Sequence, residues 1–295
     1  MTKKNTILVT GGAGFVGTNL IKRLVSETKF KILSLDDYSS GSKLNHINNK
    51  RVKYLRGKTQ NIAKIIKQPE KIKTIFHLGE FARIYQSFLK MKECIDSNFV
   101  GTNTVFNFCL LHKIKIVYSA TSASLGNKGK DKNLSPYAYT KAKNIEVLEN
   151  LKKWFNLRCE IIYFYNVYGP YQISKGHMAT VIGIFEDQFK KNKPLTVVKP
   201  GTQSRRFTHI DDTIDVCMKA WKKDLCKHYS ISHKKSYKII EVARMFKKEI
   251  KFLPFRSGER YVSSLTNTNF KNKVHKIFGK KDLKDYISNF LRNKI

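Results

Sequence analysis

Apolar positions along the first 165 residues alternate between short runs and longer helical patterns. Runs rich in β-branched residues predict strands near residues 5–10, 31–35, 73–78, 115–120 and 158–165. Between these runs, apolar residues recur with helical spacing near residues 14–27, 85–112 and 137–155. Strands that alternate with helices build a parallel sheet with helices on both faces. We therefore expect an α/β fold with a doubly wound parallel sheet.

The alternation breaks after Asn166-Val167-Tyr168-Gly169-Pro170, where the chain changes to a mixture of short segments. We therefore expect residues 1–168 to form one domain around the predicted sheet. Residues 169–295 are expected to form a smaller lobe over the carboxyl ends of the strands. Segments of the two parts are expected to interleave.

The first predicted strand passes directly into three glycines, Gly11, Gly14 and Gly17, and then into a helical pattern. Glycines at this spacing allow a tight turn, close approach of a pyrophosphate to the backbone, and close packing of helix on strand. Asp36 ends the second predicted strand, 19 residues after Gly17, close to the roughly 20 residues expected for an acid that binds ribose hydroxyls. The order of these features predicts a dinucleotide site. The acid favours NAD over NADP.

Composition limits the class of protein. With 295 residues and 41% hydrophobic content the chain can bury a large core, which excludes a disordered or fibrous protein. Five scattered cysteines without a Cys-x-x-Cys pair indicate reduced thiols in the cytoplasm, with neither a disulfide framework nor a metal site. No apolar run approaches the roughly 20 residues that span a bilayer. The formal charge of +35 is spread along the whole chain, so we expect a solvated basic surface, with neither a membrane nor a nucleic-acid partner.

A second group of residues carries candidate chemistry. Tyr137 and Lys141 lie four residues apart at the start of a predicted helix, and therefore on the same helical face. A phenol is a poor base at neutral pH, but a neighbouring ammonium and a cationic nicotinamide both favour the phenolate. Tyr137 is therefore a candidate to take a proton from a sugar hydroxyl while a hydride leaves the same carbon.

With these residues the chain resembles the extended short-chain dehydrogenase/reductases, in particular the nucleotide-sugar 4-epimerases. The resemblance covers most of the chain. Besides the glycines and the Tyr-Lys pair, the motifs that carry it are Asp36-Asp37-Tyr38-Ser39-Ser40-Gly41, His77-Leu78-Gly79, Asn98-Phe99-Val100-Gly101-Thr102, Phe164-Tyr165-Asn166-Val167-Tyr168-Gly169-Pro170, Arg205-Arg206-Phe207-Thr208-His209-Ile210-Asp211-Asp212 and Arg256-Ser257-Gly258-Glu259. The resemblance implies that residues 1–168 form a Rossmann domain that holds NAD tightly. It also implies that residues 169–295 form a lobe that binds a nucleotide diphosphate sugar as substrate.

The resemblance also implies roles for individual residues. Thr121, Tyr137 and Lys141 match the catalytic residues: the hydroxyl that binds the reacting oxygen, the acid/base, and the lysine on the nicotinamide ribose. The residues that match cofactor-binding positions are Gly11, Gly14, Phe15, Val16, Gly17, Asp36, Asp37, Leu78, Asn98, Tyr137 and Lys141. Those that match substrate-binding positions are Thr121, Asn166, Arg205, Arg256 and Ser263. Arginine suits the diphosphate because its forked donors face phosphate oxygens.

Residues after Thr121 separate reaction types in this family. The 4,6-dehydratases carry an acid there, because elimination of water needs a further general acid and base. Ser122 and Ala123 stand in these places, so the resemblance implies inversion of carbon 4 of a UDP-sugar through a 4-keto intermediate. Ser263 matches a position beside the 2-substituent of the sugar. A small residue there favours UDP-GlcNAc and UDP-GalNAc, or a mixture that includes UDP-Glc and UDP-Gal.

Relatives pair as homodimers through helices that match residues 85–112 and 137–155, so a homodimer is expected. The large apolar residues that we assign to this interface are Phe88, Leu89, Phe106, Phe108, Leu148 and Leu151.

Three departures from the family pattern stand out: a short segment of residues 122–136, Glu80, and Arg83. The last two are interpreted either as readers of an atypical sugar or as partners of each other. Two alternatives also stay open: another nucleotide-sugar enzyme, namely a decarboxylase, dehydratase or net oxidoreductase, and a non-catalytic protein that senses nucleotide or binds RNA.

Overall fold

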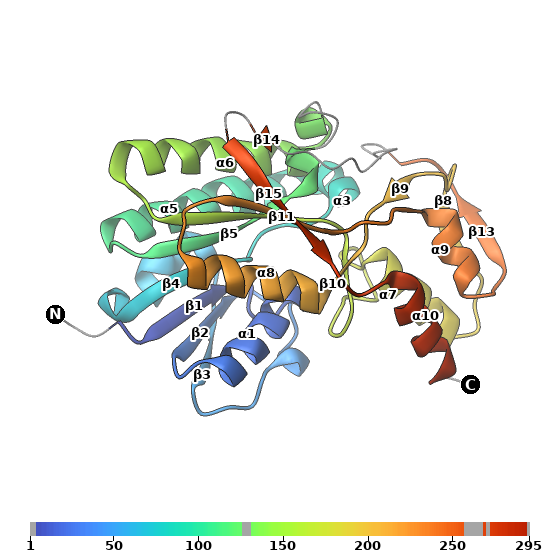
Figure 1. Cartoon of the computed structure of the whole chain (residues 1–295), viewed down its shortest axis with the longest axis horizontal. Helices are drawn as coiled ribbons and strands as arrows, with labels where there is room; N and C mark the ends of the chain where they lie inside the picture. Colours follow the sequence, from blue (N-terminus) through green and yellow to red (C-terminus); the bar gives the residue numbers. More distant parts are fainter. Residues whose placement is uncertain (1–3, 126–130, 257–267, 270–271, 294–295) are drawn as a thin grey trace.

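The computed structural model describes residues 4–125, 131–256, 268–269 and 272–293. Among these residues nine strands form one sheet in the order β14-β15-β11-β6-β5-β4-β1-β2-β3 (Figure 1). All neighbours in it are parallel except the short edge strand β14 (Thr268–Asn269), which is antiparallel to β15. The parallel strands are β1 (Thr6–Thr10), β2 (Lys31–Asp36), β3 (Val52–Arg56), β4 (Ile72–His77), β5 (Lys115–Thr121), β6 (Cys159–Phe164), β11 (His228–His233) and β15 (Asn272–Gly279). The predicted doubly wound sheet is confirmed.

Helices cover both faces of the sheet. On one face the helices are α1 (Phe15–Glu27) and α8 (Ile210–Lys223), and on the other they are α2 (Ile62–Ile65), α5 (Thr102–Leu111) and α6 (Pro136–Phe155) (Figure 1). The order of strands reverses between β1 and β4, and at such a switch point a doubly wound sheet binds its ligand. None of the helices among the described residues combines the length and apolar character that a bilayer crossing requires.

A smaller lobe with its own core lies beyond the carboxyl ends of the strands (Figure 1). It contains α7 (Val181–Lys190), α9 (Ile239–Met245), α10 (Leu283–Arg292) and the parallel pair β8 (Leu195–Val198) and β13 (Ile250–Leu253). Two short pairs accompany it: β7 (Val167–Tyr168) with β10 (Thr208–His209), and β9 (Ser204–Arg205) with β12 (Tyr237–Lys238). Residues 169–295 supply this lobe. They also supply helix α8, which covers the main sheet, and strands β11 and β15 within that sheet.

The prediction of one continuous helix over residues 85–112 was wrong. The segment forms α3 (Ile84–Leu89), α4 (Met91–Ile95), a π-helical turn (Asp96–Gly101) and α5. Lys90 has φ −127° and ψ 51°, outside the helical region, so it separates α3 from α4. Strand β3 was not predicted, because its residues are only half-buried or exposed and its apolar pattern is correspondingly weak.

The residues proposed for a dimer interface fall into an exposed group and a buried group. Phe88 and Leu89 are exposed, whereas Phe106, Phe108 and Leu148 are buried in the core between the sheet and its own helices. Leu151 packs against the same core. The assignment of Phe106, Phe108 and Leu148 to a dimer contact was therefore wrong, whereas that of the half-buried Leu151 stays a prediction. Helical spacing marks an apolar face but not the surface that the face covers.

Candidate functional site

The glycine turn after β1 has no room for side chains. Gly11 has φ +70°, and a Cβ there would lie 2.8 Å from the Gly79 backbone. A Cβ on Gly17 would lie 2.1 Å from the carbonyl oxygen of Gly11, so this glycine lets α1 sit against the turn. Gly14 precedes α1 without capping it through a side chain, which leaves the first amides of α1 for a ligand. The turn therefore fits a dinucleotide pyrophosphate.

Asp36 lies beside this turn at the end of β2. One carboxylate oxygen accepts a hydrogen bond from the amide of Ala13 at 2.9 Å, and the other accepts one from the amide of Tyr38 at 2.8 Å. Burial raises the pKa of Asp36, and the two amide hydrogen bonds oppose this rise. Asp37 is exposed and accepts a hydrogen bond from the amide of Ser39. The position of Asp36, one strand away from the glycine turn, is the one that the ribose-binding hypothesis requires.

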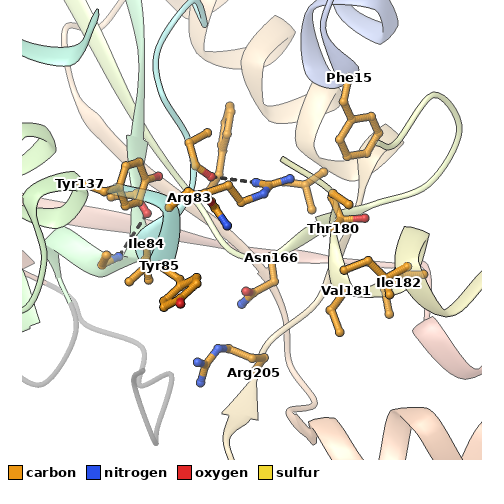
Figure 2. Close-up of a pocket in the computed structure, with 18 of the residues that line it drawn as sticks. Phe15, Arg83, Ile84, Tyr85, Tyr137, Asn166, Thr180, Val181, Ile182 and Arg205 are labelled. Carbon is orange, nitrogen blue, oxygen red and sulfur yellow. Dashed lines mark hydrogen bonds between the residues drawn. The ribbon is translucent and has the colours of Figure 1, made fainter. Parts of the chain in front are cut away.

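A cavity of about 590 Å³ opens between the carboxyl ends of β4 and β5 and the smaller lobe (Figure 2). It brings together all the described residues assigned to catalysis or substrate binding, and three further residues assigned to the cofactor alone. These are Thr121, Tyr137, Lys141, Asn166, Arg205 and Arg256, together with Phe15, Val16 and Leu78. The three glycines, Asp36, Asp37 and Asn98 lie outside its lining.

Asn98 is fully buried and binds the backbone. Its side-chain oxygen accepts a hydrogen bond from the amide of Phe81 at 2.6 Å, and its side-chain nitrogen donates to the carbonyl of Phe81 at 2.9 Å. Through this pair of bonds Asn98 holds the segment between β4 and α3, which carries Glu80 and Arg83. Direct contact of Asn98 with a cofactor stays a prediction.

Tyr137 lies in the first turn of α6. The Ser135 hydroxyl caps this helix by accepting a hydrogen bond from the amide of Ala138 at 3.1 Å, and Pro136 occupies the first helical position. Burial raises the pKa of the Tyr137 phenol to about 12, while a hydrogen bond with Thr121 lowers it and the charge of Glu80 raises it further. The phenol is therefore protonated at neutral pH, and it needs the positive charge of a ligand to act as a base.

Lys141 lies one turn further along α6 and forms a buried ion pair with Glu80. The ammonium also donates to the carbonyl of Ser119. Burial lowers the pKa of Lys141, and Glu80 opposes this effect. The other oxygen of Glu80 accepts hydrogen bonds from Thr102 at 3.1 Å and from the Tyr118 hydroxyl at 3.0 Å. The interpretation that Glu80 pairs with Arg83 was wrong.

A chain of hydrogen bonds connects the glycine side of the site with Glu80. Thr10 Oγ1 accepts from the amides of Leu78 and Gly79, so its proton goes to His77 Nδ1 at 2.7 Å. Thr102 donates its own proton to Glu80, so it accepts from His77 Nε2 at 2.9 Å. These bonds assign the Nε2-protonated, neutral form of His77, in agreement with burial, which lowers its pKa to about 4.

The residues assigned to the substrate come from the smaller lobe and the segments that lead to it. Asn166, at φ +30°, donates from its side chain to the carbonyl of Arg206 at 3.1 Å. The Arg256 guanidinium lies 5.0 Å from the centroid of the Tyr85 ring. Figure 2 shows Arg205 below Asn166 in the cavity. Ser263, with the sugar preference inferred from it, and residues 126–130 of the short segment lie outside the described residues.

Sequence reasoning missed several residues that line the cavity, among them Tyr85, Thr180 and Gln203. Tyr85 lies in the first turn of α3, directly after the segment that carries Glu80 and Arg83. Its position downstream of that segment was the only available signal. Thr180 and Gln203 follow irregular segments, for which no periodicity exists.

One group of possible metal ligands lies away from the cavity. Atoms of Glu160, Asp224 and Cys226 come within 4.8 Å of one another. The Lys115 ammonium contacts both carboxylates, at 3.2 Å and 2.7 Å. A cation of the protein therefore already balances this group.

Comparison with known proteins agrees with this geometry. Residues 7–232 match the family model described as "NAD dependent epimerase/dehydratase family". The chain is 30% identical over 227 residues to the ADP-L-glycero-D-manno-heptose-6-epimerase of Brachyspira hyodysenteriae, a match that covers 71% of this chain and 70% of the relative. Its structure is similar to the UDP-glucuronic acid 4-epimerase of Bacillus cereus in complex with UDP-glucuronic acid and NAD, with a TM-score of 0.82, 22% identity, and coverage of 98% of this chain and 100% of that chain.

The structure is also similar to that of DesIV, the dTDP-glucose 4,6-dehydratase of Streptomyces venezuelae with NAD and TYD bound. The TM-score is 0.85 at 18% identity, and the match covers 97% of this chain and 96% of that chain. At these identities the solved structures show the fold alone, whereas the family model covers most of the chain. The chain belongs to the NAD dependent epimerase/dehydratase family.

Proposed function

We propose that this protein binds NAD and a UDP-sugar and inverts carbon 4 of the sugar through a 4-keto intermediate. The observation that carries the proposal is the meeting of the Tyr137 phenol, its hydrogen-bond partner Thr121 and the arginines Arg205 and Arg256 in one cavity at the switch point of the sheet. The glycine turn, Asp36, Phe15, Val16 and Leu78 would hold the cofactor. Bound NAD would supply the hydride acceptor, and its reduced form would supply the hydride donor.

Tyr137, with Thr121 as its hydrogen-bond partner, would take up and return the proton of the 4-hydroxyl. In the absence of ligands the phenol keeps its proton, because burial and Glu80 both raise its pKa. A positive charge beside the phenol lowers this pKa, so loss of the proton is coupled to occupation of the site. The same phenol returns a proton to the 4-oxygen when the keto group is reduced again on its other face.

Lys141 would bind the ribose next to the nicotinamide. An ammonium has three donors, and two of those of Lys141 have partners among the described residues, Glu80 and the carbonyl of Ser119. The position of this lysine is therefore fixed before any ligand enters.

Inversion requires that the sugar turn over while its diphosphate stays bound. Arg205 and Arg256 approach the cavity from the smaller lobe, and guanidinium groups suit phosphate oxygens through paired hydrogen bonds. Asn166 would add a side-chain amide. Phosphate held from the lobe, with the hexose near Tyr137, supports a rotation about the diphosphate link.

The acids around the cavity favour epimerisation over dehydration. Of the described residues that line it, Glu80 is the only carboxylate, and Lys141, Thr102 and Tyr118 bind its oxygens. Ser122 and Ala123 occupy the places next to Thr121 where dehydration needs an acid. Glu80 is therefore poorly suited to serve as that acid.

A direct test incubates the purified full-length protein, with NAD added, with a panel of UDP-hexoses and UDP-N-acetylhexosamines, and separates the products by chromatography. Interconversion of C4 epimers without net NADH absorbance supports the proposal. Accumulation of NADH would indicate a net oxidoreductase, and loss of water or carbon dioxide a dehydratase or decarboxylase. Binding of NAD without turnover of any sugar nucleotide would favour a sensor.

A further inference from the structure

A third arginine lines the cavity that Arg205 and Arg256 share. Arg83 lies in the segment between β4 and α3, on the opposite side from the smaller lobe. Figure 2 shows its guanidinium in the middle of the cavity, between Tyr137 on one side and Thr180 on the other. No role assigned so far requires a cation at this place.

Neutral backbone groups hold this guanidinium. One terminal nitrogen donates to the carbonyl of Ala82 at 2.7 Å, and the other donates to the carbonyl of Met178. The Nε–H is buried and has no hydrogen-bond partner among the described residues. A guanidinium has five donors, so Arg83 keeps donors for a ligand after both backbone bonds have formed.

The charge of Arg83 also lacks a counter-ion. The two lysines that are buried in the described part of the chain are paired: Lys141 with Glu80, and Lys115 with Glu160 and Asp224. No carboxylate in the described part of the chain forms an ion pair with Arg83. Burial lowers the pKa of this arginine, which means that its surroundings penalise the positive charge. Arg83 is half-buried with a fully buried Nε–H, and a cation so placed is costly for the protein unless an anion accompanies it in the functional state.

The location of the charge indicates which part of a substrate it meets. Tyr137 is close enough to influence the pKa of Arg83 electrostatically, so the guanidinium lies at the reacting end of the cavity. Figure 2 shows Arg205 below Asn166, away from Arg83, on the side of the cavity that the proposed function assigns to the diphosphate. An anion opposite Arg83 would therefore be part of the hexose.

We propose that Arg83 binds a carboxylate carried by the hexose, so that the preferred substrates are nucleotide-linked uronic acids. The inference rests on the proposed function and specifies the sugar that the proposal left open. Guanidinium and carboxylate match in charge and in planar, paired hydrogen-bond geometry. A second anionic group, the diphosphate, offers the same attraction, and the experiment separates the two.

The experiment compares initial rates of the NAD-loaded protein with UDP-glucuronate and UDP-galacturonate against UDP-glucose and UDP-galactose. We expect higher kcat/KM for the uronates. In Arg83→Gln the ratio of uronate to neutral kcat/KM should fall roughly 10- to 100-fold, because charge-assisted hydrogen bonds to the carboxylate are lost. Arg206→Gln is the matched control. Arg206 likewise donates to two carbonyls and has a buried, unpartnered Nε, but it lies outside the cavity lining, so the ratio should not change.

If Arg83→Gln lowers kcat/KM equally for uronate and neutral substrates, the arginine binds the diphosphate. If kcat/KM falls only at low pH for both kinds of substrate, the arginine acts by lowering the pKa of Tyr137. Either result overturns the inference and leaves the proposed function in place. If no sugar nucleotide is converted, the proposed function fails by itself. Calorimetric affinities for UDP-glucuronate and UDP-glucose then decide the inference, which holds only if tighter binding of the uronate depends on Arg83.

Discussion

The Lys141 ammonium and the Glu80 carboxylate contact each other with side chains that are only 5% and 2% exposed. Glu80 therefore neutralises the lysine that is expected to lower the pKa of Tyr137. Its own charge acts in the opposite direction, because it raises the pKa of that phenol. The pair therefore leaves less of the phenol ionised in the empty site than the Tyr-Lys spacing alone indicates.

Glu80→Gln should make Tyr137 easier to ionise. Removal of the negative charge lowers the phenol pKa directly and leaves the Lys141 charge uncompensated, which lowers it again. The acidic limb of the kcat/KM profile should therefore move to lower pH. Glu146→Gln, which breaks the exposed Lys143–Glu146 pair on the same helix, is the control and should leave the profile unchanged. A shift toward higher pH in Glu80→Gln would contradict this electrostatic account.

The same substitution should weaken the fold. An uncompensated charge in a buried pair costs about 3 kcal/mol or more, and the Gln amide recovers only part of the bonds to Thr102 and Tyr118. Urea denaturation of Glu80→Gln and of the Glu146→Gln control measures the difference in the free energy of unfolding.

Tyr137→Phe should abolish turnover and leave the affinity for NAD nearly unchanged. The substitution removes the oxygen that handles the proton, at a cost of about 100-fold or more in kcat, while the glycine turn and Asp36 stay intact. Tyr139→Phe, two residues along α6 and 48% exposed, is the matched control. Activity of Tyr137→Phe within tenfold of the parent would remove Tyr137 from the mechanism.

His77 should make the fold sensitive to acid. Burial lowers its pKa from 6.5 to about 4, so the unfolded chain binds a proton more readily than the folded one. Stability from this residue is fully present above pH 6.5 and is lost as pH falls toward 4, by about 3 kcal/mol in total. Thermal denaturation at several pH values should show a flatter dependence in His77→Gln. An equal slope in both proteins would mean that other groups cause the loss.

NAD should bind at least roughly tenfold tighter than NADP, because about 1.4 kcal/mol of repulsion between Asp36 and a 2′-phosphate is enough for that ratio. Lys43, seven residues after Asp36 in the sequence, is a candidate to offset this repulsion. Fluorescence titration of both cofactors measures the preference, and Asp36→Asn should narrow it. Equal affinities in the parent would indicate that Asp36 does not contact the ribose.

Self-association should use the apolar residues that α3, α4 and the π-helical turn leave exposed. Leu89 is 63% exposed, Met91 55% and Val100 48%. We expect a homodimer by light scattering, and Leu89→Lys should shift it toward monomer. High salt should strengthen the dimer, because each chain carries a formal charge of +35. A parent protein that stays monomeric at all salt concentrations would contradict the prediction.

Local features of the sequence predicted strands β1, β2, β4, β5 and β6, the glycine turn and the Tyr-Lys face, because each depends on neighbours within a few residues. The Glu80–Lys141 pair joins positions 61 residues apart, and only the parallel register of β4 and β5 brings them together. The break at Lys90 and the neutral partners of Arg83 depend likewise on tertiary packing. Glu80 and Arg83 depart from the family pattern in the sequence, but no local pattern encodes the tertiary contacts that supply their partners.

The sheet is completed late in the chain. Strand β15 pairs along the whole length of β11, and both follow the smaller lobe's first helix in sequence. During synthesis the edge of β6, and then that of β11, emerges before its neighbour exists, and an unpaired edge is a template for intermolecular pairing. Newly made chains are therefore expected to need protection from aggregation until residues 272–279 have left the ribosome.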